Sequence, residues 1–122
     1  MTMGDTPILD ISLGIGSDLS AAQYLAMTLN NDGNVTTASA APVIGILQGG
    51  ADGSVKATIG QIRVAGTTKI LSDTSSIVIG SKLKLGSNGK AALSTDPSDV
   101  ILGIALSANS GASVPVSVLL RL

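Results

Sequence analysis

The chain has 122 residues, enough for one compact domain, and its seven Lys and Arg nearly balance eight Asp, which leaves a net charge of −1. The absence of Cys and His excludes zinc fingers, thiol nucleophiles and Ser-His-Asp triads. The cations are scattered, and no apolar run approaches the roughly 18 residues that span a bilayer, so neither nucleic acid nor a membrane is expected as a partner.

The composition favours strands and turns over helices. There are 15 Gly, a single aromatic residue (Tyr24) and no Glu. Glu favours helix interiors, whereas Asp favours turns and caps. We therefore expect a compact all-β fold whose core is packed from Val, Ile, Leu and Ala. The mean hydropathy of +0.51 is high for a soluble monomer. Apolar surface covered by a partner would account for it, and small residues such as Ala also raise the value.

Residues 1–17 differ from the sequence that follows. After Pro7, apolar residues recur along this segment at Ile8, Leu9, Ile11, Leu13 and Ile15. From Leu9 onward the period is two, which is typical of a strand. Two interpretations remain open: the segment is the first strand of the domain, or it is an arm that adds a strand to the sheet of another subunit.

Between residues 24 and 64 the sequence predicts four strands separated by turns. The predicted strands are Tyr24–Leu29, Val35–Ala38, Val43–Gln48 and Ser54–Val64. Asp32-Gly33 suits the positive φ angles of a tight hairpin, and the glycine-rich residues 49–53 predict the next turn.

The second half begins with a less regular segment. Residues 65–79 predict two short strands around a turn at 72–75. The remaining predicted elements are a strand at Lys82–Leu85, a turn at 86–89, a strand at Lys90–Leu93, a loop at 96–99 and two strands within 101–120.

The two halves repeat each other. Leu29–Val35 matches Leu85–Ala91, Val43–Leu47 matches Ile101–Ala105, and Val55–Ile59 matches Val114–Val118. The offsets, from 33 to 89, 45 to 103 and 55 to 114, are 56, 58 and 59, a drift typical of a diverged duplication. We expect half-repeats at about 24–64 and 82–122, joined by residues 65–81, to close on one another as a small barrel or sandwich.

Gly45 and Gly103 lie inside two predicted strands at matching places. A glycine there marks a bulge, a bend or the close approach of another backbone. The matched pair favours strands that bend around a closed barrel, and a ligand approaching the backbone is the functional alternative.

Few residues are candidates for a catalytic, metal-binding or phosphate-binding site. Asp96 and Asp99 form an acid pair, but the sequence DPSD is common in capped loops. The oxygens of residues 30–34 would need a closing Glu to match a calcium loop, and the chain has none. Residues 49–53 lack the Lys-Ser/Thr of a phosphate-binding loop. Lys56 and Lys82 would act as nucleophiles only if buried, and Asp18 and Asp73 show no partner. We therefore predict no catalytic residue, metal site, cofactor or small-molecule substrate.

Carrier domains that present a lysine at a hairpin tip are another class of small duplicated β protein. The predicted tips are NNDGN, GGADG, GSNG and SANSGA, and none of them contains a lysine. Lys90 lies just after one tip, so a carrier function has little support.

Three segments in this order resemble the capsid cement or decoration proteins of tailed bacteriophages. They are DLSAAQYLAMTLNNDGNV, APVIGILQGGADGSVKATI and DVILGIALSANSGASVPVSVLL, and they span Asp18 to Leu120. The matching residues include Tyr24, Asp32-Gly33, Gly45–Gln48 and Gly103–Leu106. The chain departs from the family at Ser107, where an acidic residue is common, and in the middle segment around residues 67–85.

The resemblance implies an all-β virion protein on the capsid exterior, made in the bacterial host cytoplasm. It implies binding to the major capsid protein, as homotrimers at three-fold positions, and stabilisation of the expanded shell against internal DNA pressure. Residues 1–17 lie outside the resemblance and carry the apolar alternation, so we expect an N-terminal arm at 1–17 and a single β domain at 18–122. The residues expected to contact the capsid are Pro7, Ile8, Leu9, Ile11, Leu13 and Ile15.

Two other functions stay open. A trimeric β module of a tail, fibre or adhesin would have the same composition but would not bind bare shells. An enzyme is disfavoured because His, Cys and Glu are absent.

Overall fold

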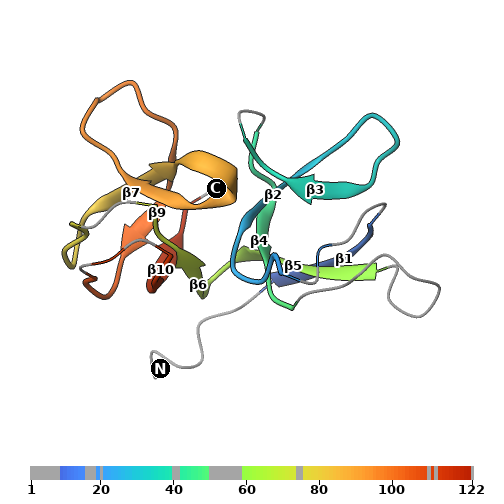
Figure 1. The fold of residues 1–122 in the computed structure, drawn as a ribbon, viewed down its shortest axis with the longest axis horizontal. Coiled ribbons are helices and arrows are strands. Elements are labelled where there is room, and N and C mark those ends of the chain that lie inside the picture. The colour runs from blue at the N-terminus through green and yellow to red at the C-terminus, as the bar shows by residue number, and fades with distance from the viewer. Residues whose placement is uncertain are drawn as a thin grey trace.

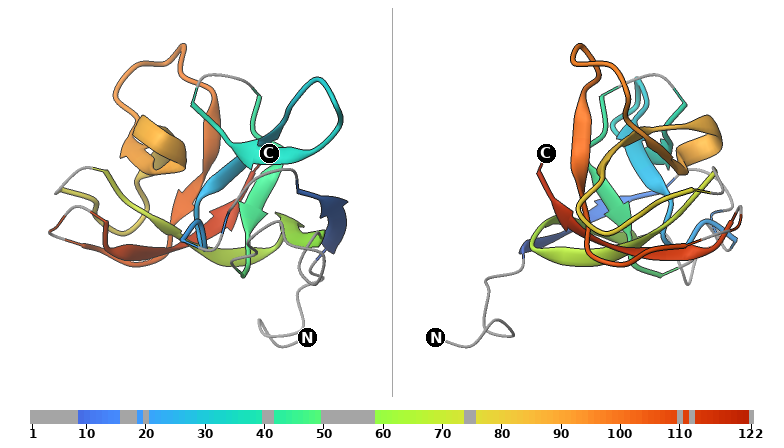
Figure 2. Two further views of the ribbon diagram at one scale, coloured as in Figure 1. Left: turned by 45° about the vertical axis from the view of Figure 1, so that its right-hand side comes forward. Right: turned by 90° about the vertical axis from the view of Figure 1, so that its left-hand side faces the viewer.

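The molecule consists of two five-stranded antiparallel sheets that lie side by side (Figures 1 and 2). The computed structural model describes residues 9–15, 19, 21–39, 42–49, 59–73, 76–109, 111 and 113–121. Within these residues the only helix is the short 3-10 element η2 (Ser87–Gly89). The fold is therefore all-β, as the composition predicts.

The first sheet, which we call the first unit, comes from the N-terminal half. Its strands are β1 (Leu9–Gly14), β2 (Ala26–Leu29), β3 (Val35–Thr37), β4 (Gly45–Leu47) and β5 (Ile59–Ala65), in the spatial order β1-β5-β4-β2-β3. A parallel bridge between Ile15 and Val35 connects the end of β1 to β3. The two outer strands of the sheet thus meet at one point.

The second sheet, the second unit, repeats this arrangement. Its strands are β6 (Thr67–Leu71), β7 (Lys82–Leu85), β8 (Ala91–Leu93), β9 (Ile101–Ala105) and β10 (Pro115–Leu120), in the order β6-β10-β9-β7-β8. A parallel bridge between Ser72 and Ala91 connects the end of β6 to β8. Both units have the same strand order and the same closing bridge, which is the pattern of a duplicated unit.

The limits of the units differ from the predicted ranges. The predicted arm, residues 1–17, contains β1, which pairs with β5 of the same chain. The predicted connecting segment, residues 65–81, contains β6, the corresponding first strand of the second unit. Only Gly66 (φ 95°) separates β5 from β6. The sequence motifs that match between the halves lie in the hairpins and later strands, so they do not show the first strand of either unit.

Two smaller predictions also differ from the structure. Tyr24 precedes β2 and has a φ of 65°, so it does not begin a strand. In the described part of residues 65–79, β6 is followed by an isolated bridge between Ile77 and Asn109 instead of a second strand. The apolar residues 77–79 have the composition of a strand, but among the described residues their only pairing is the bridge at Ile77.

Aliphatic side chains fill two buried clusters. One lies inside the first unit and includes Leu47 and Ile62, both with 0% exposure. The other lies inside the second unit around Leu83, and it also contains Ala26 and Ile46 from the first unit. Because this second cluster crosses the junction, hydrophobic burial holds the two units together.

Gly45 and Gly103 hold the same position in β4 and β9. A Cβ on Gly45 would lie 2.5 Å from the carbonyl oxygen of Arg63, and a Cβ on Gly103 would clash with the carbonyl oxygen of Leu119. Both glycines therefore allow the neighbouring strand of the same unit to come close. The alternative of a ligand approaching these positions is not needed to explain them.

Candidate interaction site

Three of the six residues predicted to contact a capsid face the chain's own core. Ile11 and Leu13 are half-buried against the core of the first unit, and Ile15 is only 5% exposed. A strand with one face on its own core has the same period-two pattern as an arm, so the sequence does not distinguish them. These three side chains serve the fold of the first unit.

The other three residues lie at the start of the segment. Leu9 is 54% exposed, and Pro7 and Ile8 lie outside the described residues. β1 is an outer strand: among the described residues, β5 lies along one edge and only the bridge at Ile15 touches the other. An open strand edge of this kind can accept a strand from a partner.

An ion pair fixes β1 to β5 near this edge. The guanidinium of Arg63 donates from Nε to Oδ1 of Asp10 at 2.9 Å and from Nη2 to Oδ2 at 3.1 Å. It also donates from Nη1 to the carbonyl oxygen of Thr67 at 3.1 Å. The hydrogen bond from Arg63 holds the pKa of Asp10 below its ordinary value, and the same bond raises the pKa of Arg63. The pair thus connects both strands to the start of the second unit.

Besides the bond from Arg63, the hydrogen bonds that cross the junction between the units join Gln48 to Thr68 and Tyr24 to Leu71. The side-chain amide of Gln48 donates to Oγ1 of Thr68 at 2.9 Å. The backbone N–H of Leu71 donates to the carbonyl oxygen of Tyr24 at 3.0 Å. Both reach β6, whose outer edge is therefore covered by the first unit. The sequence gives no signal for these contacts, because isolated polar residues in strands usually face solvent.

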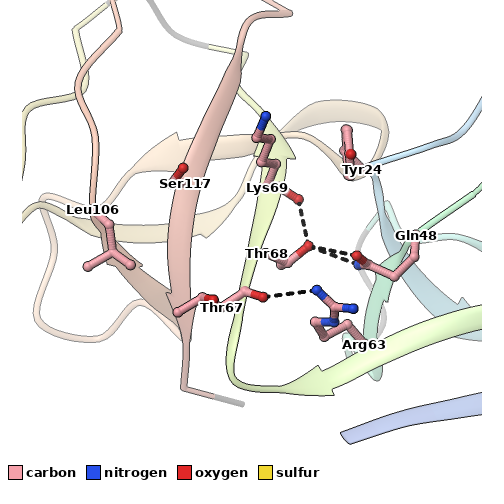
Figure 3. Close-up of a pocket in the computed structure, with 8 residues that line it drawn as sticks. All are labelled: Tyr24, Gln48, Arg63, Thr67, Thr68, Lys69, Leu106 and Ser117. Atoms are coloured by element: carbon pink, nitrogen blue, oxygen red, sulfur yellow. Dashed lines mark hydrogen bonds between the residues drawn. The ribbon is translucent and has the colours of Figure 1, made fainter. Parts of the chain in front are cut away.

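A shallow groove of about 400 Å³ opens along this junction (Figure 3). Its lining residues are Tyr24, Gln48, Arg63, Thr67, Thr68, Lys69, Leu106 and Ser117. Figure 3 shows Gln48 and Arg63 reaching from the first unit toward the backbone and hydroxyl of β6. Among the described residues, the lining contains hydroxyl, amide and cationic groups together with the side chain of Leu106, and no carboxylate.

Tyr24 borders the groove with its backbone in the left-handed region. This conformation costs a residue with a Cβ about 1 kcal/mol. Two backbone hydrogen bonds hold it: the N–H donates to the carbonyl of Leu47 at 2.8 Å, and the carbonyl accepts from Leu71. The resemblance singled out Tyr24, and the structure places it at the junction of the units.

The acidic loop at 96–99 has a structural role. The carboxylate of Asp99 accepts from Oγ of Ser94 at 2.9 Å and from the N–H of Asp96 at 3.2 Å, and Nζ of Lys84 lies 3.6 Å away. The hydrogen bond from Ser94 is the main cause that lowers the pKa of Asp99. Asp96 in turn accepts from Ser98 at 2.9 Å. These contacts cap the loop and explain both acids.

The other polar candidates also stabilise turns. Oδ1 of Asn30 accepts from the N–H groups of Asp32 and Asn34 at 2.9 and 3.0 Å, which fixes the hairpin tip. Asp73, which shows no partner in the sequence, accepts from the N–H of Ser87 at 2.8 Å. Its partner lies 14 positions away, so spacing alone does not reveal it.

The remaining candidates give no site. Residues 50–58, which include most of the glycine-rich turn and Lys56, lie outside the described residues, as does Asp18; Lys82 is exposed. Among the described residues, no three acidic side chains gather where they could hold a metal ion. No helix in the described part of the chain is long and apolar enough to cross a membrane.

Comparison with known proteins gives one informative result. No family model matches the chain, and no curated protein matches it. Among solved structures, it is similar to the N base of the head fiber protein gp8.5 of bacteriophage phi29, with a TM-score of 0.67 and 18% sequence identity. The match covers 94% of this chain and 95% of that chain. The two chains therefore share one fold over almost their whole lengths, including both units.

Proposed function

We propose that this chain is a structural protein of a tailed-phage virion and that it binds the outer surface of the capsid. The observation that carries the proposal is the fold shared with a phage head fiber base over 94% of the chain. The motifs that resemble capsid decoration proteins point independently to the same location.

The capsid contact is proposed for the start of the first unit. The side chains of Ile11, Leu13 and Ile15 pack against the chain's own core. We therefore assign the proposed capsid contact to Pro7, Ile8 and Leu9 and to the open edge of β1. Main-chain hydrogen bonds along a strand edge give affinity without any particular side chain. Several linked copies on a repeating lattice would raise the avidity of a weak single contact.

The finer proposal is that bound copies, as homotrimers at three-fold positions, stabilise the expanded shell against internal DNA pressure. A stiff body suits this role. The two units share a buried cluster and are separated only by Gly66, so a load applied to one unit passes to the other.

A second candidate is the base of a fibre, which anchors another structure to the capsid. The similarity to a head fiber base favours it. A fibre base binds the shell as a cement protein does, but the shell does not depend on it for stability.

The experiment is co-sedimentation of the purified chain with undecorated shells of its source virus, both expanded and unexpanded. Saturable binding to expanded shells supports the proposal, and no binding to either shell contradicts it. Heating the decorated and bare shells then separates the two roles, because only a cement protein raises the temperature at which the shell opens.

A variant that lacks residues 1–8 tests the proposed contact. The deletion must stop before Leu9, because Leu9–Gly14 is a strand of the first sheet. Full occupancy by this variant would show that Pro7 and Ile8 do not carry the contact.

A further inference from the structure

Matching hydrogen bonds fix which residues of the two units are equivalent at the junction. The N–H of Tyr24 donates to the carbonyl of Leu47 at 2.8 Å, and the N–H of Gly80 donates to the carbonyl of Ala105 at 2.8 Å. Tyr24 and Gly80 both have positive φ, 65° and 87°. Among the described residues, the carbonyl of Tyr24 accepts the N–H of Leu71 from the other unit, and the carbonyl of Gly80 accepts no hydrogen bond.

A second pair of equivalent residues differs in its surroundings. The N–H of Gln48 donates to the carbonyl of Gln61 at 3.0 Å, and the N–H of Leu106 donates to that of Ser117 at 2.7 Å. The side chain of Gln48 is bonded to Thr68 across the junction. Leu106, in the same position on the second unit, is 45% exposed.

The face around Leu106 is open where its counterpart is buried. In the first unit, Ala26 pairs with Ile46, and both are completely buried against the second unit's cluster. In the second unit, the equivalent pair is Lys82 and Ile104, of which Lys82 is exposed and Ile104 is half-buried. Ile79, one residue before Gly80, is 71% exposed. We call Ile79, Gly80, Lys82, Ile104 and Leu106 the open face of the second unit.

The matching face of the first unit is less covered than its counterpart in the second unit: Ile11 is half-buried against its own core and Gly33 is exposed, whereas Thr68 and Gly89 are buried. The second unit contacts the first through Thr68, Leu71 and Gly89, which correspond to Ile11, Gly14 and Gly33. We call these last three residues the open face of the first unit.

The two hairpin glycines show the difference between the covered and the open face. A Cβ on Gly89 would lie 2.7 Å from the side chain of Thr37 and 2.9 Å from the carbonyl of Ala26. A Cβ on Gly33 would meet nothing within 4 Å. Gly33 and Gly89 hold the same place in the two hairpins, with φ of 79° and 77°, although Asn88 has a φ of 53° and its counterpart Asp32 has no positive φ. Of the two glycines, only Gly89 lies against the other unit.

We propose that the chain associates with a second copy of itself, head to tail, through these two faces. The open face of the second unit in one copy receives the open face of the first unit in the next copy, in the arrangement that joins the units within one chain. Leu106 then packs against Ile11 where Gln48 bonds Thr68, and the carbonyl of Gly80 accepts the N–H of Gly14.

The chemistry of the equivalent positions identifies the occupant as another copy. Inside the chain the facing pair is Gln48 and Thr68, both polar, and between copies it is Leu106 and Ile11, both apolar. Within each pair the two side chains have the same polarity. This match is expected of residues that meet in an interface, whereas residues that face solvent have no reason to match. The contact is heterologous, so repeating it gives a closed ring or a filament. This contact would supply the interface of the homotrimer in the proposed function. Because self-association needs no capsid, the self-association and the capsid binding can be disproved separately.

Sedimentation velocity of the purified full chain over a range of concentrations tests the inference without shells. The wild type is expected to form a discrete oligomer, and L106D is expected to associate at least about tenfold more weakly, because a charge replaces a leucine that the contact between copies would bury. V100D is the matched control: Val100 is 82% exposed and corresponds to Pro42, which the internal junction leaves exposed. A monomeric wild type at every concentration, or L106D behaving like the wild type, would overturn the inference.

Cross-linking gives a second readout that does not depend on weakening the contact. The chain has no Cys, so a variant with Ile11→Cys and Leu106→Cys carries only these two thiols. A short bis-maleimide is expected to join the copies into covalent multimers. The variant with Ile11→Cys and Val100→Cys is expected to stay monomeric under the same conditions. Equal cross-linking of the two variants would contradict the proposed pairing.

Discussion

Tyr24 and Gly80 hold the same position in the two units, each with a positive φ and each donating its N–H to the end of a matching strand at 2.8 Å. The first unit thus has a tyrosine at a position where the second unit has glycine, the residue that adopts a positive φ most easily. The carbonyl of Tyr24 accepts a hydrogen bond from Leu71, which helps to hold this conformation at the junction.

Gly80→Ala is expected to lower the free energy of unfolding by about 1 kcal/mol. A Cβ at Gly80 would meet nothing within 4 Å, so the cost comes from the left-handed backbone alone. Gly49→Ala is the control, since Gly49 has equal space and no positive φ, and it is expected to be neutral or slightly stabilising. Urea denaturation of both variants checks this, and equal stabilities would contradict the assignment of strain to φ.

Gly45→Ala and Gly103→Ala are expected to destabilise the chain more strongly, by about 2–3 kcal/mol, because the added methyl group meets the backbone of the neighbouring strand. Gly60→Ala is the graded comparison. Its Cβ would lie 3.1 Å from Cδ1 of Leu47, which is a side-chain end that can move. Thermal unfolding of the three variants should place Gly60→Ala nearest the wild type, and the reverse order would show that the strands are not so close.

The sequence predicts the fold class and most of the hairpins because they depend on local signals. Asp32-Gly33 and the stretch at 86–89 specify turns, and alternating apolar residues specify strands. The identity of the first strand depends instead on pairing between distant residues. β1 meets β5 about fifty residues later, and neither strand contains a turn signal that would join them.

The contacts at the junction cannot be predicted from the sequence for a similar reason. Gln48 and Thr68 are ordinary polar residues in their own strands, and only the packing of the units makes them partners. The sequence likewise does not show that Ile79 and Leu106 are exposed, because apolar residues in such segments resemble core residues. The high mean hydropathy predicts that some apolar surface is covered, but it does not say where.

The ion pair between Asp10 and Arg63 gives a pH-dependent stability. The pKa of Asp10 is lower in the folded chain than in the unfolded chain, so its contribution is complete above the ordinary Asp value of about 4 and is lost as pH falls through the folded value. At pH 7, Asp10→Asn is expected to cost about 0.5–1 kcal/mol, since both side chains are partly exposed. The difference from the wild type should shrink at pH 2. A difference that is the same at both pH values would show that the charge is not the cause.

The bond between Gln48 and Thr68 is expected to show coupling in a double-mutant cycle. Thr68→Val removes both hydrogen bonds between the amide of Gln48 and Oγ1 of Thr68, and leaves only the bond from Nε2 of Gln48 to the carbonyl of Ile46. This variant is expected to cost about 1 kcal/mol, because the site is partly buried. Adding Gln48→Leu gives the apolar pairing proposed between copies and is expected to recover part of that loss. Chemical denaturation of the four proteins gives the coupling energy, and simple additivity would mean that the two side chains do not interact.

Cryo-electron microscopy of expanded shells mixed with the purified chain tests the capsid-surface role most directly. Ordered density is expected on the outer face of the shell, with a shape into which both units fit and with the start of β1 nearest the major capsid protein. Shells that stay bare at saturating protein concentration, or density confined to the tail, would contradict it.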